Sequence, residues 1–231
     1  MKPQPDEYTC GPTCLHAVYG YYGDAIPLEE VIADIAPHDT EGTLGVTLAV
    51  HALRRGYRAT IYTYNLQVFD PTWFEGDVPH LRRRLEAQVA AKSDPKVKLA
   101  SETYLEFLDR GGQVYLQDLT PNLIRRHLKR SKPILTGLSA TYLYRAMREV
   151  ETGRQQLPDD VRGEVQGHFV VLCGYDLDTR EVLLADPLWP NPLAASHFYS
   201  VSIDRLINSI LLGILTFDAN LLILEPRSVA H

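Results

Sequence analysis

Two apolar segments in the C-terminal part constrain the fold of this 231-residue chain more than any other feature. They are GHFVVLCGYD, beginning at Gly167, and VLLADP, ending at Pro187, with the turn-rich LDTR between them. Apolar and β-branched residues on either side of a short turn predict a β-hairpin. Because the strand-like HFYSVS and NLLILEP follow, we expect the second half of the chain to be mainly an antiparallel sheet.

The first half has helical periodicity instead. The segment CGPTCLHAVYGYYG, from Cys10, repeats apolar residues at helical spacing, and Pro12 suits a first turn. Further helical patterns cover 27–36, 43–55 and much of 77–130, while 57–64 alternates like a strand. We also expect a helix over 142–150 and an exposed loop over 151–164. The prediction is one α+β domain over residues 1–231, with helices early, the sheet late and 65–131 as a candidate helical insertion.

The charge balance and the N-terminus narrow the classes of protein. Lys and Arg number 23 against 29 Asp and Glu, so the formal net charge is −6. Because phosphate binding needs a basic surface, we do not expect a nucleic-acid partner. The segment MKPQPDEYT lacks the apolar core of a signal peptide, and polar residues interrupt the most apolar stretch, 206–224. We therefore expect a cytoplasmic protein without a membrane segment; the sequence leaves its oligomeric state open.

Cysteine chemistry is the next constraint. The chain has three cysteines, Cys10, Cys14 and Cys173, and an odd number without an export signal argues against a disulfide scaffold. A metal site at Cys10 and Cys14 would need a second pair of ligands, and no CxxC or HxxxH spacing supplies one. We expect no metal and no cofactor, and packing roles for Cys14 and Cys173.

The remaining interpretation is that Cys10 is a nucleophile. A helix N-terminus favours the thiolate form of a cysteine. In the predicted hairpin His168 and Asp186 are nearly opposite each other, close enough for a carboxylate to orient an imidazole base. Gln4 precedes Cys10 by six residues, where its amide can join the Cys10 backbone N–H in stabilising an oxyanion.

These residues carry a resemblance to a known family. Gln4, CGPTCL, GHFVVLCGYD and VLLADP together resemble cysteine peptidase family 39, papain-like enzymes known best for removing double-glycine leader peptides from bacteriocins. The chain looks more like the stand-alone bacterial members, and Thr9 replaces the acidic residue common before the cysteine. The resemblance implies a papain-like fold in which the helix that Cys10 opens packs on the C-terminal sheet. It also implies that Cys10 is the nucleophile, His168 the base, Asp186 its partner and Gln4 part of the oxyanion hole.

The sequence therefore predicts thiol-dependent hydrolysis of a peptide or amide bond, with a peptide or protein as substrate. Two alternatives stay open. In the first, an amine captures the acyl-enzyme, which gives a transpeptidase akin to phytochelatin synthase. In the second, the fold is a catalytically inactive module that binds peptides.

Overall fold

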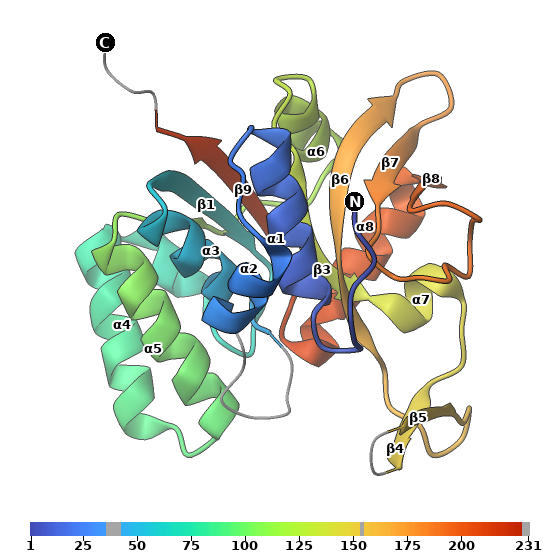
Figure 1. Cartoon of the computed structure of the whole chain (residues 1–231). Coiled ribbons are helices and arrows are strands. Elements are labelled where there is room, and N and C mark those ends of the chain that lie inside the picture. The colour runs from blue at the N-terminus through green and yellow to red at the C-terminus, as the bar shows by residue number, and fades with distance from the viewer. Residues whose placement is uncertain (36–42, 153–154, 228–231) are drawn as a thin grey trace.

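The computed structural model describes residues 1–35, 43–152 and 155–227. Figure 1 shows helices packed around one large sheet, which is the core of a mixed α/β fold. The helices are α1 (Cys10–Tyr21), α2 (Leu28–Ile35), α3 (Gly45–Arg54), α4 (Val78–Ala91), α5 (Pro95–Asp109), α6 (Pro121–Leu128), α7 (Ala140–Tyr144) and α8 (Ile203–Leu212), with the short 3-10 turns η1 (Pro71–Glu75) and η2 (Gly213–Thr216). The strands are β1 (Tyr57–Thr63), β2 (Gln113–Tyr115), β3 (Ile134–Ser139), β4 (Glu149–Thr152), β5 (Gln155–Pro158), β6 (Gly167–Asp176), β7 (Glu181–Ala185), β8 (Phe198–Ser202) and β9 (Asn220–Pro226).

N-capping side chains explain where several of these helices begin. Thr120 accepts a hydrogen bond from the backbone N–H of Leu123 at the start of α6. Asp77 and Asp94 cap α4 and α5 in the same way, and each is followed by a proline in the first turn. The helical patterns predicted within 77–130 are therefore α4, α5 and α6. The helix expected over 27–36 is α2, and residue 36 lies outside the described residues.

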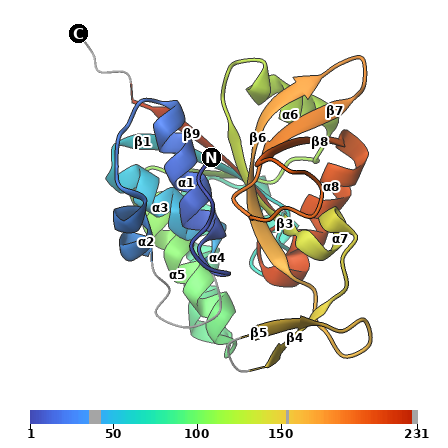
Figure 2. The same ribbon diagram turned by 45° about the vertical axis from the view of Figure 1, so that its right-hand side comes forward.

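The large sheet has the strand order β2-β1-β9-β3-β6-β7-β8 and is antiparallel except for the β1–β2 pair. Its strands alternate between two apolar clusters, as a pleated sheet requires. In β9, Leu222 and Leu224 face the cluster that includes α1 and α3, whereas Leu221 and Ile223 face the cluster that includes α6 and α8. Helices thus cover both faces of the sheet, and Figure 2 shows α1 and α3 away from α7 and α8.

The expected order of helices first and sheet last holds only in part. β1 and β2 come from the first half of the chain, and β1 pairs with β9 along its whole length. The sequence pattern of 57–64 predicted this strand but not its partner. Pairing with the last strand places β1 inside the sheet, between β2 and β9.

The region after β3 also differs from the prediction. A helix was expected over 142–150, but α7 ends at Tyr144 because Arg145 adopts the left-handed conformation, with φ of 53°. The expected loop over 151–164 instead pairs β4 with β5, which form a separate two-stranded sheet. This hairpin projects from the body of the molecule in Figures 1 and 2. Residues 153 and 154 of the expected loop lie outside the described residues.

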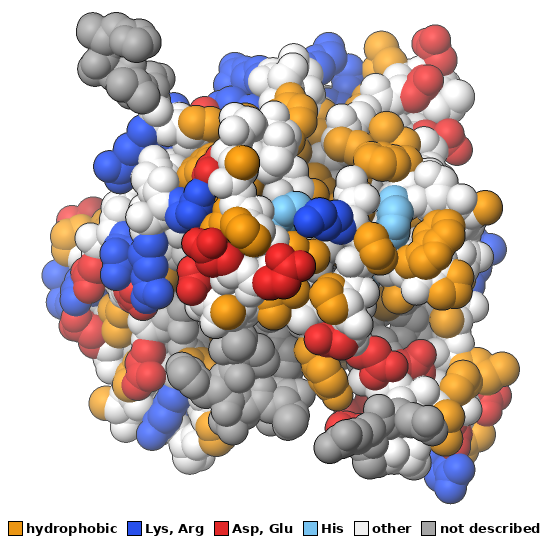
Figure 3. All heavy atoms as spheres, viewed as in Figure 1, with side chains coloured by type: hydrophobic (Ala, Val, Ile, Leu, Met, Phe, Trp, Pro, Cys, Tyr) orange, Lys and Arg blue, Asp and Glu red, His pale blue; other side chains and the backbone are white. Residues whose placement is uncertain are grey.

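The surface carries charges of both signs. On the face shown in Figure 3, basic and acidic side chains are intermixed, as the modest net charge of −6 suggests. None of the described helices combines the length and the hydropathy needed to cross a bilayer.

Candidate active site

Cys10 is the first residue of α1 and is 9% exposed. The first N–H groups of a helix have no acceptor within the helix, so the start of α1 presents amide dipoles around this thiol. α1 lies close to β6 because Gly11 has no side chain: a Cβ there would be 3.3 Å from side-chain atoms of Leu48 and Phe169. The packing of α1 thus brings Cys10 to the start of β6, where His168 lies.

His168 and Asp186 lie just beyond the end of the β6–β7 ladder. The last pair of that ladder is Val171 with Ala185, so the two strands separate before they reach His168 and Asp186. His168 Nε2 donates to Asp186 Oδ1 over 2.8 Å, with both side chains buried. The short strand pairing leaves room between the chains for this side-chain contact.

Four hydrogen bonds hold the Asp186 carboxylate. Oδ1 accepts from His168 and from the backbone N–H of Leu188, at 2.8 and 2.9 Å. Oδ2 accepts from the hydroxyls of Tyr144 and Tyr199, at 2.7 and 2.6 Å. Burial by itself would raise the pKa of Asp186, but the hydrogen bonds and the charge of His168 outweigh burial and lower this pKa to about 2. The carboxylate therefore stays ionised without contact with solvent.

The same contacts act on His168 in the opposite direction. Burial lowers the pKa of an imidazole, yet hydrogen bonds with Asp186 and with the Cys10 side chain, and the charges of these two groups, raise the pKa of His168 to about 10. Since Nε2 is bonded to Asp186, Nδ1 is the ring nitrogen left for Cys10. The arrangement therefore stabilises a protonated imidazole next to the thiol.

Gln4 lies near this group, but its side chain bonds to a residue of its own N-terminal segment. The backbone N–H of Gln4 donates to the carbonyl of Pro187 over 2.9 Å, which ties the N-terminal segment to the residue after Asp186. Gln4 Nε2 donates to the carbonyl of Asp6 over 2.8 Å. An amide nitrogen has two hydrogens, so one remains for a ligand.

The other two cysteines differ from each other. Cys14 is fully buried, and its Sγ donates to the carbonyl of Phe169 over 3.2 Å, in line with the expected packing role. Burial, together with the neighbouring Cys10, raises the pKa of Cys14 well above its ordinary value. The expectation that Cys173 packs as a small hydrophobe is wrong, because Cys173 is exposed at an irregularity between Leu172 and Gly174 in β6.

Tyr144 and Tyr199 are the residues of this site that sequence reasoning missed. Tyr144 ends α7, and Tyr199 lies in β8 opposite Leu184 of β7. Burial and the neighbouring Asp186 raise the pKa of both tyrosines, so both remain protonated donors at neutral pH. In the sequence they occur in YLY and HFYS, where a tyrosine is equally typical of apolar packing, and no local signal points to Asp186.

The site thus holds a thiol, an imidazole and a carboxylate, three groups that together can activate a nucleophile toward a carbonyl carbon. Within the described residues, no three His, Cys, Asp or Glu side chains are grouped so that they could hold a metal ion.

Comparison with known proteins assigns the chain to a family. The model described as the Peptidase_C39 like family matches residues 1–200, so the chain belongs to the Peptidase_C39 like family. No curated protein matched the sequence.

Three of the solved structures that are similar to the chain are as follows. The peptidase domain of Streptococcus ComA, a bi-functional ABC transporter in a quorum-sensing pathway, is 14% identical, with 98% of this chain and 97% of that chain covered and a TM-score of 0.44. A double glycine motif protease from an AMS/PCAT transporter, in complex with the leader peptide, is 14% identical, with 97% and 89% covered and a TM-score of 0.44. A structure described as a C39-like peptidase from Bacillus anthracis is 14% identical, with 99% and 94% covered and a TM-score of 0.42.

Proposed function

We propose that this protein is a papain-like thiol hydrolase that cleaves a peptide or amide bond through a Cys10–His168–Asp186 triad. The observation that carries the proposal is the buried His168, bonded through Nε2 to Asp186 and interacting with the side chain of Cys10 at the start of α1. Membership of the Peptidase_C39 like family supports a peptidase-type function. The substrate is a peptide or protein, and the reaction needs no metal or organic cofactor.

In the first half of the reaction the Cys10 thiolate attacks the carbonyl carbon and forms a C–S bond. The proton on His168 Nδ1 passes to the leaving nitrogen, the C–N bond breaks, and an amine leaves. In the second half a water molecule attacks the thioester carbonyl and gives its proton to His168. The C–S bond then breaks, which releases the carboxylic acid and regenerates the thiolate–imidazolium pair. Asp186 keeps the imidazole oriented and stabilises its charge throughout.

The oxyanion of each tetrahedral intermediate needs hydrogen-bond donors. The backbone N–H of Cys10, at the helix start, and the amide hydrogen of Gln4 that is not bonded to Asp6 can supply them. We further propose that residues 1–231 form one peptidase domain, in which 65–131, with α4, α5 and α6, is a helical insertion.

Cys10 and Cys173 differ in exposure and provide an internal control for the proposal. Iodoacetamide labelling followed by mass spectrometry should modify Cys10 faster than Cys173 near neutral pH, although Cys10 is nearly buried and Cys173 is exposed. A thiolate paired with an imidazolium is the physical reason. If Cys173 reacts first, Cys10 is not an activated nucleophile and the proposal is wrong.

A second measurement tests turnover itself. Intact-mass analysis after exposure to a peptide library should reveal an acyl adduct on wild-type protein that Cys10→Ala lacks. Gln4→Ala should reduce turnover by roughly 10²–10³ while the alkylation rate of Cys10 changes little, because an oxyanion donor acts only on the intermediate.

A further inference from the structure

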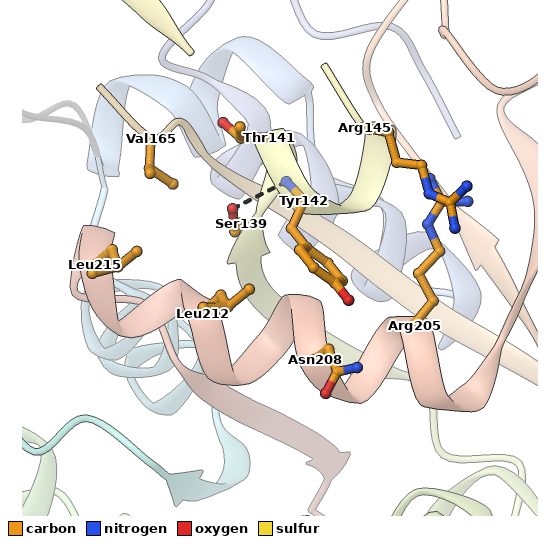
Figure 4. Close-up of a pocket in the computed structure, with 9 residues that line it drawn as sticks. All are labelled: Ser139, Thr141, Tyr142, Arg145, Val165, Arg205, Asn208, Leu212 and Leu215. Carbon is orange, nitrogen blue, oxygen red and sulfur yellow. Dashed lines mark hydrogen bonds between the residues drawn. The ribbon is translucent and has the colours of Figure 1, made fainter. Parts of the chain in front are cut away.

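A cavity of about 490 Å³ opens beside α7 and α8. Figure 4 shows its two ends: Arg145 and Arg205 lie at one, and Val165, Leu212 and Leu215 line the other. Ser139, Thr141, Tyr142 and Asn208 complete the wall. The volume falls within the range of about 300–1,000 Å³ that is typical of small-molecule sites.

The two arginines place like charges next to each other. Neither guanidinium forms an ion pair with a carboxylate in the described part of the chain. By contrast, Arg180, just before β7, has its guanidinium 3.5 Å from the carboxylate of Asp204 in α8. Burial and the neighbouring Arg145 both lower the pKa of Arg205, so the two cations repel each other. An anion between them would relieve this repulsion.

A contact with the backbone holds the side chain of Arg205, and Arg145 has an unusual backbone conformation of its own. Arg205 donates through Nη2 to the carbonyl of Leu143, and its Nε is buried without a hydrogen-bond partner among the described residues. Arg145 has a φ of 53°, a left-handed conformation that is unfavourable for a residue other than glycine, and its side chain extends toward Arg205 in Figure 4. A buried cationic N–H without a partner is expensive, and a negative charge beside the guanidinium would offset part of that cost.

We propose that this cavity binds an organic carboxylate that carries an aliphatic group. Arg145 and Arg205 bind the carboxylate, because paired guanidiniums present donors in the geometry that two carboxylate oxygens accept. Val165, Leu212 and Leu215 contact the aliphatic part. Such a group can be the C-terminus of a peptide or an acidic side chain next to an apolar residue. The proposal does not depend on the activity of Cys10, since none of the cavity residues belongs to the triad.

Calorimetric titration with defined peptides tests this site. We expect acetyl-Leu-Leu with a free carboxylate, acetyl-Glu-Leu-amide, or both to bind with a dissociation constant of about 1 mM or lower. The two acids distinguish the C-terminal from the side-chain source. Acetyl-Leu-Leu-amide, which has the aliphatic groups without the charge, should not bind. Equal binding of this amide, or no saturation by either acid, would overturn the proposal.

Substitutions inside and outside the cavity test whether the acid binds there. Arg145→Gln should weaken binding of the acid by about ten-fold or more, as loss of a charged hydrogen bond predicts. Leu215→Ser, at a residue that is 57% exposed, tests the apolar end without disturbing the core and should also weaken binding. Arg180→Gln, which removes the same charge outside the cavity, is the matched control and should leave binding unchanged. If Arg180→Gln weakens binding as much as Arg145→Gln, the effect is one of overall charge and no site exists here.

Discussion

Two buried histidines in this protein have pKa values shifted in opposite directions. His168, at the start of β6, is 6% exposed, and His127, in α6, is 9% exposed. The pKa of His168 is raised to about 10, whereas the pKa of His127 is lowered to about 4. Burial lowers the pKa of both. The difference is that His168 is bonded to Asp186, while neither ring nitrogen of His127 has a hydrogen-bond partner among the described residues and its neighbour Arg126 adds a like charge.

At these two positions, where burial is similar, the partner of the imidazole decides whether its pKa is raised or lowered. The direction of each pKa shift also determines whether stability rises or falls with pH. His127 binds its proton less well when folded, so its contribution falls as the pH drops from 6.5 toward about 4. His168 binds its proton more tightly when folded, so its contribution is complete below pH 6.5 and is lost as the pH rises through about 10. Asp186 contributes above its ordinary pKa of 3.8, and that contribution is lost as the pH falls through about 2.

The largest effect should come from Asp186→Asn, which removes the charge that distinguishes the two histidines while keeping the shape of the side chain. We expect turnover to fall by roughly 10³–10⁴, because the imidazolium loses its stabilising partner. The NMR titration of His168 should move toward lower pH, and that of His127 should not move. A His168 that still titrates near its wild-type pKa would show that Asp186 does not set it.

Tyr199→Phe should have the next largest effect. It removes one hydrogen bond to a buried carboxylate, and urea denaturation should show a loss of roughly 1.5–3 kcal/mol in the free energy of unfolding. The pKa of Asp186 should also rise, which a purely structural role for the hydroxyl would not produce. Tyr142→Phe, at an exposed tyrosine nearby, is the control. Equal destabilisation by both substitutions would contradict the role given to Tyr199.

His127→Phe tests the other side of the comparison. A ring that cannot be protonated avoids the cost of charging a buried imidazole, so the variant should lose less stability than wild type between neutral pH and about pH 5. The difference should be on the order of 1–2 kcal/mol after allowance for solvent screening. Urea midpoints at the two pH values measure it. An identical pH dependence in the two proteins would mean that His127 is protonated freely in the folded state.

The smallest effect should come from Arg126→Gln. Arg126 is the second cause of the lowered pKa of His127, after burial, so its removal should raise that pKa without restoring the ordinary value of 6.5. NMR titration of the His127 ring measures the change. A full return to the ordinary value would show that charge repulsion, rather than burial, dominates at α6.

The sequence predicted elements where the signal is local. Thr120 caps α6, Pro12 lies in the first turn of α1, and the turn between β6 and β7 lies where LDTR occurs. It also predicted Gln4, Cys10, His168 and Asp186 as one group, because their order matches a known family pattern. Tyr144 was predicted as part of a longer helix. Its contact with Asp186 depends on α7 ending at that residue, which the sequence pattern did not indicate.

His127 illustrates the same limit. It lies in RRHLKR, a charge run that is typical of a solvated helix face, yet its ring is buried. Which residues of α6 are buried depends on which of them face the sheet. That contact joins segments that are far apart in the sequence, so a local pattern does not determine it.

By itself, the sequence determined the local elements, the residue types needed for thiol chemistry and the family, because caps, turns and periodicity act over a few residues. Only the tertiary structure decided which side chains share a buried environment. It placed β1 between β2 and β9, two tyrosines on Asp186, and Arg145 next to Arg205. The physical reason is that pKa values and hydrogen-bond partners depend on atoms close in space, and packing brings these atoms together from distant parts of the chain.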